Sequence, residues 1–131
     1  LAHRLLAIAY ERKEMFTEAL SENQIWGDLT KDRLRTEVAC GHVYAVSGKR
    51  DDAMQLLDRI EQEISHRKDL TYAVGLIYTG LKEIDRAFEW FDRAYEYRAS
   101  ALGSLKVDPK LDFLRADPRY TALLKKMRIQ P

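Results

Sequence analysis

The feature that most constrains this chain is an internal repeat of 34 residues. At that shift three tyrosines coincide, each with a small residue three positions before it and an alanine nine positions after it. These nine residues are Ala7, Tyr10, Ala19, Gly41, Tyr44, Ala53, Gly75, Tyr78 and Ala87. Self-similarity at such a period indicates a repeat architecture, in which stacked copies of one unit share a continuous core.

Each repeat predicts two antiparallel helices. A small residue and a tyrosine three positions later lie on one helix face, so a second helix can approach the small residue while the ring fills the space beside it. The later alanine supplies the matching small contact. Turn-forming residues separate the helices, as in Ser47–Asp51 and Gly80–Glu83, and Asp51 is a candidate helix cap. We expect helix pairs over 2–13 and 16–29, 34–46 and 51–66, and 69–79 and 84–98.

This period and this small–x–x–Tyr…Ala layout resemble the tetratricopeptide repeat. The resemblance covers residues 1–101 and implies an all-α, right-handed superhelix of antiparallel hairpins. Two features depart from the family's pattern. Asn23 is polar where the second helix usually offers a large apolar side chain, and Lys31, Ser65 and Ala99 stand where a proline usually closes each repeat.

The last thirty residues differ from the repeats. Asp108-Pro109 and Asp117-Pro118 each predict a helix start, with aspartate as N-cap and proline at the first helical position. Tyr120, Leu123, Leu124 and Met127 would share one face of the second helix. A repeat array needs an end piece, so we divide the chain into repeats 1–33, 34–67 and 68–101 and a capping segment 102–131. The first repeat is expected to be incomplete at its amino end.

The segment from Leu105 to Met127 also resembles a tail of bacterial regulatory proteins. In those proteins, tetratricopeptide regions follow winged-helix activator, protein kinase or nucleotide cyclase domains. The resemblance implies a C-terminal sensor or docking part of a larger protein. The start at Leu1, without methionine or a signal peptide, supports the same expectation.

The first helices of the three hairpins predict a concave binding groove. The centre of the groove is apolar, and two arginines and a histidine supply polar side chains. Such a surface suits an extended or helical peptide that has apolar anchors and an acidic group. The predicted lining is Arg4, Ile8, Glu11, Val38, His42, Ala45, Tyr72, Leu76 and Thr79, with Leu5, Arg35 and Val46 in a flanking row. The alternative is that a neighbouring helix or the tail buries part of this stripe.

Nothing in the sequence predicts catalysis, a metal site or a cofactor. His42 has no acidic residue three or four positions away on its helix, so we expect a packed side chain. The single cysteine, Cys40, is expected to be a buried apolar contact. The only asparagine, Asn23, lies on a second helix, and no lysine lies in the stripe. These positions lack the carboxylate clamp of tetratricopeptide domains that hold chaperone tails.

The charge balance bears on possible partners. Twenty-two basic and 21 acidic residues leave a net charge of +1, which predicts neither nucleic-acid binding nor attachment to a membrane. The free cysteine favours a cytoplasmic location, although a tethered extracytoplasmic module also fits. Each repeat carries five basic and six acidic residues, whereas the tail carries seven and three. A basic tail is therefore expected to dock on mildly acidic repeats.

Together these observations predict a non-catalytic module that binds a protein or peptide partner in its groove. Two alternatives stay open. The open end of the array could mediate weak homo-oligomerisation, or the module could regulate an upstream DNA-binding, kinase or cyclase domain of its own chain.

Overall fold

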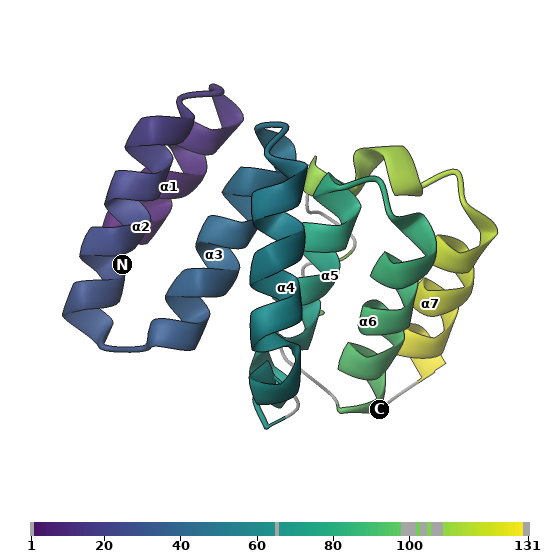
Figure 1. Cartoon of the computed structure of the whole chain (residues 1–131). Coiled ribbons are helices and arrows are strands. Elements are labelled where there is room, and N and C mark those ends of the chain that lie inside the picture. Colours follow the sequence, from purple (N-terminus) through teal and green to yellow (C-terminus); the bar gives the residue numbers. More distant parts are fainter. Residues whose placement is uncertain (1, 65, 98–101, 103–104, 106–108, 130–131) are drawn as a thin grey trace. The chain divides into compact units, whose positions relative to one another are not determined.

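The structure is a computed structural model that describes residues 2–64, 66–97, 102, 105 and 109–129 (Figure 1). Every regular element in these residues is a helix, which confirms the predicted all-α class. The chain forms two compact units, Leu1–Glu63 and Ile64–Pro131.

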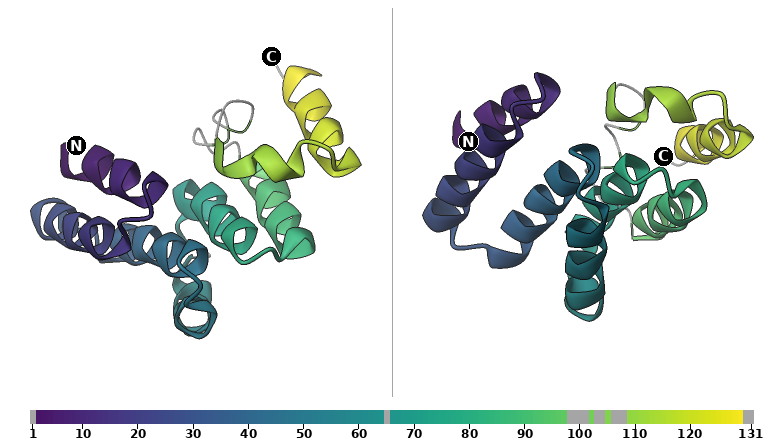
Figure 2. Two further views of the ribbon diagram at one scale, coloured as in Figure 1. Left: turned by 90° about the horizontal axis from the view of Figure 1, so that it is seen from above. Right: turned by 45° about the horizontal axis from the view of Figure 1, so that its top comes forward.

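The first unit contains the helices of the first two predicted repeats. They are α1 (Ala2–Arg12), α2 (Phe16–Thr30), α3 (Arg33–Val46) and α4 (Arg50–Ile64), whose last residue crosses the boundary between the units. Figure 2 shows α1 lying along α2, and α2 also packs against α3. Asp51 lies inside the first turn of α4 rather than at its N-cap, where its charge favours the helix dipole.

The second unit contains the third predicted hairpin and the tail. Its elements are the short 3₁₀ helix η1 (Lys68–Leu70), α5 (Thr71–Gly80), α6 (Ile84–Glu96), the 3₁₀ helix η3 (Pro109–Leu114) and α7 (Pro118–Ile129). Helix α5 pairs with α6, and η3 packs against α5. The predicted helix start at Asp108 lies outside the described residues, as do Ser65 and Ala99.

The three hairpin turns repeat with the predicted period down to single backbone hydrogen bonds. The amides of Met15, Lys49 and Glu83 donate to the carbonyls of Tyr10, Tyr44 and Tyr78 over 2.8, 2.9 and 2.9 Å. The residue before each of these amides, Glu14, Gly48 or Lys82, has a positive φ of 61°, 85° or 63°. A residue with left-handed backbone angles, followed by an amide that donates to the carbonyl five positions before it, forms the Schellman motif that commonly ends helices. Its recurrence at intervals of 34 residues shows that the three turns share one geometry.

The small repeat residues lie in the packed interior, as expected. Ala7, Ala19, Ala53 and Ala87 are each 0% exposed. Gly41, Gly75 and Tyr78 are also buried, whereas Tyr10 and Tyr44 are half-buried. Asn23, which is polar where the family's pattern has a large apolar side chain, is fully buried in α2.

Two glycines mark close approaches between helices. A Cβ added at Gly75 would lie 2.5 Å from Cε1 of Phe91, so α5 and α6 touch there. A Cβ at Gly27 would lie 2.7 Å from Cγ2 of Thr36, so α2 and α3 are equally close. The repeated pattern predicts a close contact at Gly75 but not at Gly27, which lies outside that pattern.

Helix α7 lies against α6 through specific contacts. Arg119 Nη1 is 2.6 Å from Asp85 Oδ1, and its guanidinium lies 4.8 Å from the centre of the Phe88 ring. The Tyr120 hydroxyl donates to the carbonyl of Leu105 over 3.1 Å. The backbone amide of Arg119 donates to Asp117 Oδ1 over 2.9 Å, which is the cap predicted for this helix.

Candidate functional site

The predicted groove residues are mostly buried. Seven of them expose less than a tenth of their surface: Glu11, Val38, His42, Ala45, Tyr72, Leu76 and Thr79. Ile8 is half-buried, and the side chain of Arg4 lies outside the described part of the structure. The burial of these seven residues agrees with the alternative to an open groove, in which neighbouring elements cover the stripe. They therefore offer little surface to a partner.

Two residues of the stripe show why it is buried in the second unit. The Tyr72 ring lies 5.5 Å from that of Phe91 on α6, which places Tyr72 in the core of its own hairpin. The Thr79 hydroxyl donates to the carbonyl of Gly75 over 2.9 Å, a bond within α5. Both side chains are therefore engaged inside the unit.

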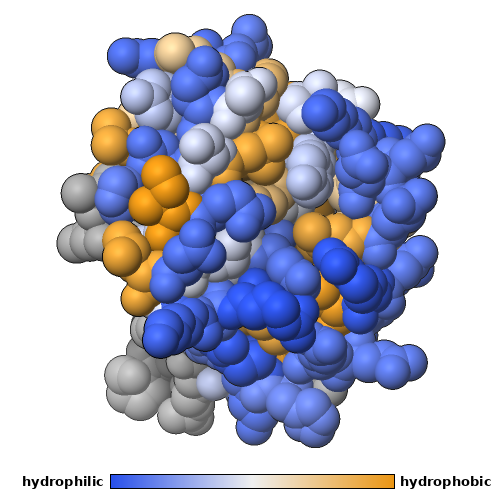
Figure 3. Space-filling model, turned by 60° about the vertical axis from the view of Figure 1, so that its left-hand side comes forward, coloured by the Kyte–Doolittle hydropathy of each residue, from blue (hydrophilic) through white to orange (hydrophobic). Residues whose placement is uncertain are grey.

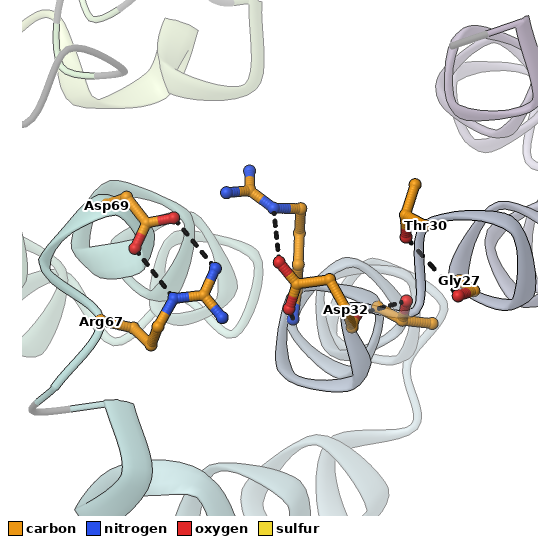
Figure 4. Close-up of polar contacts among 7 residues, drawn as sticks. Gly27, Thr30, Asp32, Arg67 and Asp69 are labelled. Carbon is orange, nitrogen blue, oxygen red and sulfur yellow. Dashed lines mark hydrogen bonds and ion pairs between the residues drawn. The ribbon is translucent and has the colours of Figure 1, made fainter.

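The flanking row of the predicted groove is exposed. Leu5 on α1 exposes 58% of its surface and Val46 on α3 exposes 39%. Arg35 lies between them in sequence, half-buried, with its Nε 3.3 Å from Asp32 Oδ2. Asp32 also caps α3 by accepting the Arg35 amide over 3.2 Å (Figure 4). The cap therefore restrains the backbone and the side chain of Arg35 together.

Exposed apolar side chains are concentrated on the first hairpin. Among the described residues, seven large hydrophobic side chains are exposed, and five of these belong to α1, α2 or the turn between them. The five are Leu5, Leu6, Met15, Ile25 and Leu29. Figure 3 shows hydrophobic side chains interrupting the hydrophilic surface on the face that it draws.

A cavity of about 770 Å³ opens between α2, α3 and α4, entirely within the first unit. Acidic and basic residues line it in equal number: Asp28, Glu37 and Asp52, and Lys31, Arg33 and Arg59. Uncharged side chains complete the wall, chiefly Gln24, Thr36, Cys40, Tyr44 and Gln55. No sequence pattern predicts this cavity, because its lining comes from three helices and resembles an ordinary charged surface.

Glu37 is the centre of the cavity's charge network. Its Oε1 accepts a hydrogen bond of 3.0 Å from Arg33 and lies 3.6 Å from Nη2 of Arg59. Arg33 also contacts Glu63 over 2.7 Å, and hydrogen bonds to Glu63 and Glu37 raise the pKa of Arg33. The other oxygen, Glu37 Oε2, is buried and accepts no hydrogen bond in the described structure.

Tyr44 contributes a protonated hydroxyl to the lining of the cavity. Burial, followed by the proximity of Cys40 and Asp52, raises the pKa of Tyr44, so its hydroxyl remains a hydrogen-bond donor at neutral pH. Gln24 Nε2 lies 3.7 Å from the sulfur of Cys40. Cys40 is buried, as predicted.

A buried pair of ionisable groups links α1 to α3. Nδ1 of His42 contacts Oε1 of Glu11, and both side chains are almost wholly removed from solvent. Sequence spacing relates His42 only to residues on its own helix. Its contact with Glu11 on another helix was therefore not predicted. Cys40 lies two positions before His42 and therefore points to a different face of α3. The geometry does not place a thiol nucleophile on this imidazole.

No protein-family model, curated protein or solved structure shows significant similarity to this chain. The assignment of function therefore depends on the chain's own surfaces. Within the described residues, no three His, Cys, Asp or Glu side chains gather as a metal site would need. None of the described helices combines the length and the apolar character needed to cross a membrane.

Proposed function

We propose that this chain is a non-catalytic protein-interaction module made of tetratricopeptide-like hairpins. The recurrence of one turn geometry at Glu14, Gly48 and Lys82 supports the relation between the hairpins. The observation that carries the interaction role is the concentration of exposed hydrophobic side chains on the first hairpin. Exposed apolar side chains that gather on one hairpin favour a surface that binds another protein.

The proposed partner is a peptide segment with apolar anchors. Leu5 and Leu6 of α1 and Ile25 and Leu29 of α2 would receive those anchors, since their side chains are the most exposed apolar groups of these helices. This surface replaces the buried centre of the predicted groove and keeps Leu5 of its flanking row. A bacterial regulatory protein, as the tail's resemblance implies, is the context that we propose for the module.

Selection of peptides from a displayed random library tests this role. Selected peptides should be rich in apolar residues and should bind Leu29→Glu about tenfold more weakly or worse, because a charge would enter the apolar contact. Thr121→Glu on the exposed surface of α7, outside the first hairpin, is the matched control and should bind as the parent does. Equal binding to the parent and to Leu29→Glu would refute this docking surface.

Self-association through the same hairpin is the second candidate, because exposed apolar residues of one copy can cover those of another. Sedimentation over a concentration series separates the two. A dimer that Leu29→Glu abolishes and Thr121→Glu preserves would favour self-association, whereas a monomer at every concentration would reject it.

A further inference from the structure

Helix α2 presents an outward face to solvent. Its inward side is marked by Ala19 and Asn23, which are each 0% exposed. On the outward side, Ile25 exposes 40% of its surface and Leu29 exposes 67%. Leu29 is the most exposed large hydrophobic side chain in the part of the chain that the structure describes. Apolar surface of this kind gains free energy when a partner removes it from water.

Two acidic residues continue the line of these apolar side chains. Glu18, Glu22, Ile25 and Leu29 are spaced at i, i+4, i+7 and i+11, which places them along one face of the helix. We call these four residues the α2 stripe. It rises about 16 Å along the helix axis from its first residue to its last. The stripe is acidic toward the start of the helix and apolar toward its end.

The charged side chains of α2 are all acidic. The helix carries Glu18, Glu22 and Asp28 and contains no lysine or arginine. Glu22 is engaged by Nδ1 of His3 over 2.6 Å. Glu18 and Asp28 are exposed, and neither forms an ion pair within the described residues. Two carboxylates therefore flank the apolar side chains and remain available to positive charge on a partner.

The surface of α2 favours a helical partner over an extended one. An extended peptide gains main-chain hydrogen bonds from the edge of a sheet, and the regular elements of the described residues are all helices. The amides and carbonyls in the middle of α2 are bonded within the helix itself. A partner helix satisfies its own main chain in the same way and presents side chains at a spacing that matches the α2 stripe.

We infer that the α2 stripe binds an amphipathic helix of another protein, one that carries lysine or arginine beside its apolar side chains. Apolar residues one turn apart on that helix cover Ile25 and Leu29, and its basic residues lie against Glu18 and Asp28. The inference rests on the proposed interaction role of the first hairpin and adds the conformation and the charge of the partner. Complementary charge of this kind provides specificity and raises the rate of association.

Fluorescence anisotropy of the full chain with three designed peptides tests the inference. The first peptide is a stapled helix of about four turns with two leucines one turn apart and lysines on the same face. The second has glutamates in place of the lysines, and the third is an unstapled form of the first with a central proline. We expect the lysine helix to bind about tenfold more tightly than either of the others at low salt. Its advantage over the glutamate helix should shrink in about 0.5 M sodium chloride, which screens exposed charges.

Charge-reversed variants connect binding to the α2 stripe. Glu18→Lys combined with Asp28→Lys should invert the preference, so that the glutamate helix binds more tightly than the lysine helix. Glu89→Lys combined with Asp92→Lys makes the same change of net charge on exposed positions of α6 and should preserve the parent's preference. Asp28→Lys alone places a cation in the last turn of α2, where the helix dipole favours it. This single variant should weaken binding of the lysine helix even where Glu18→Lys impairs folding.

Four results would overturn the inference. They are equal affinity of the parent for the lysine and glutamate helices, equal binding of the proline peptide, an unchanged preference in the variant with both α2 charges reversed, and a dimer of the chain that this variant abolishes. The last result would identify a second copy as the occupant. The proposed function fails separately, through library peptides that ignore Leu29→Glu. Library peptides that depend on Leu29 without any preference for lysine would keep the proposed function and reject this inference.

Discussion

The contact between Gly75 and Phe91 supports a quantitative prediction for Gly75→Ala. The added Cβ would lie 2.5 Å from Cε1 and 2.7 Å from Cδ1 of the Phe91 ring, far closer than carbon atoms normally approach. The ring has little room to move. It is 0% exposed and lies 5.5 Å from the Tyr72 ring and 6.0 Å from the Phe88 ring.

Two opposing effects determine the size of the change. Overpacking of a core typically costs about 1–3 kcal/mol, and a ring held on both sides places this site near the upper value. Alanine in a helix regains about 1 kcal/mol relative to glycine. We therefore expect Gly75→Ala to lower the free energy of unfolding by about 2 kcal/mol.

Urea unfolding followed by circular dichroism measures this difference, with an unchanged slope showing that the unfolded state is the same. The matched control is Gly75→Ala in a Phe91→Leu background, where the ring is absent and the cost should fall below about 1 kcal/mol. A neutral or stabilising Gly75→Ala in the parent chain would show that helix propensity outweighs the contact. The account of the α5–α6 packing given above would then be wrong.

Three further predictions address other contacts. Gly27→Ala should destabilise the first unit by about 1–3 kcal/mol in urea, and Thr36→Ala should recover part of the loss because it removes the Cγ2 that lies 2.7 Å from the added carbon. His42→Ala should cost about 1–3 kcal/mol in the same assay, because it deprives a buried carboxylate of its imidazole; an unchanged midpoint would contradict the buried pair. Hydrogen bonds from Arg119 lower the pKa of Asp117, so this carboxylate stabilises the fold above its unfolded-state pKa and loses that effect as the pH falls below about 4. Asp117→Asn should flatten this acid dependence in a pH series of urea midpoints, and an unaltered profile would argue against it.

The repeat pattern was sufficient to predict most of the helical organisation. Tyr10, Tyr44 and Tyr78 mark the same turn of three helices, and their carbonyls accept the same hydrogen bond in each copy. The aspartate-proline pair at Asp117 predicted the start of α7. These features were readable because each depends on residues close together in sequence.

The candidate sites were less predictable because they depend on contacts between helices. Val38 and Tyr72 fit an open groove by their spacing, but spacing does not reveal what packs over a helix face. Glu11 is 31 positions from His42, beyond any pattern within one helix. Glu37 resembled a solvated surface acid until three helices placed its Oε2 in a buried setting.

The recurring turn also indicates where insertions and deletions can be accommodated. One extra residue between Tyr44 and Lys49 would break the hydrogen bond from the Lys49 amide to the Tyr44 carbonyl, and it would change the direction in which the next helix leaves the turn. The connection after Thr30 carries no such fixed pattern, since Lys31 and Asp32 join helices that each have their own cap. Variants of this chain that differ in length should therefore gain or lose residues at that connection, while the turns at Glu14, Gly48 and Lys82 keep their length.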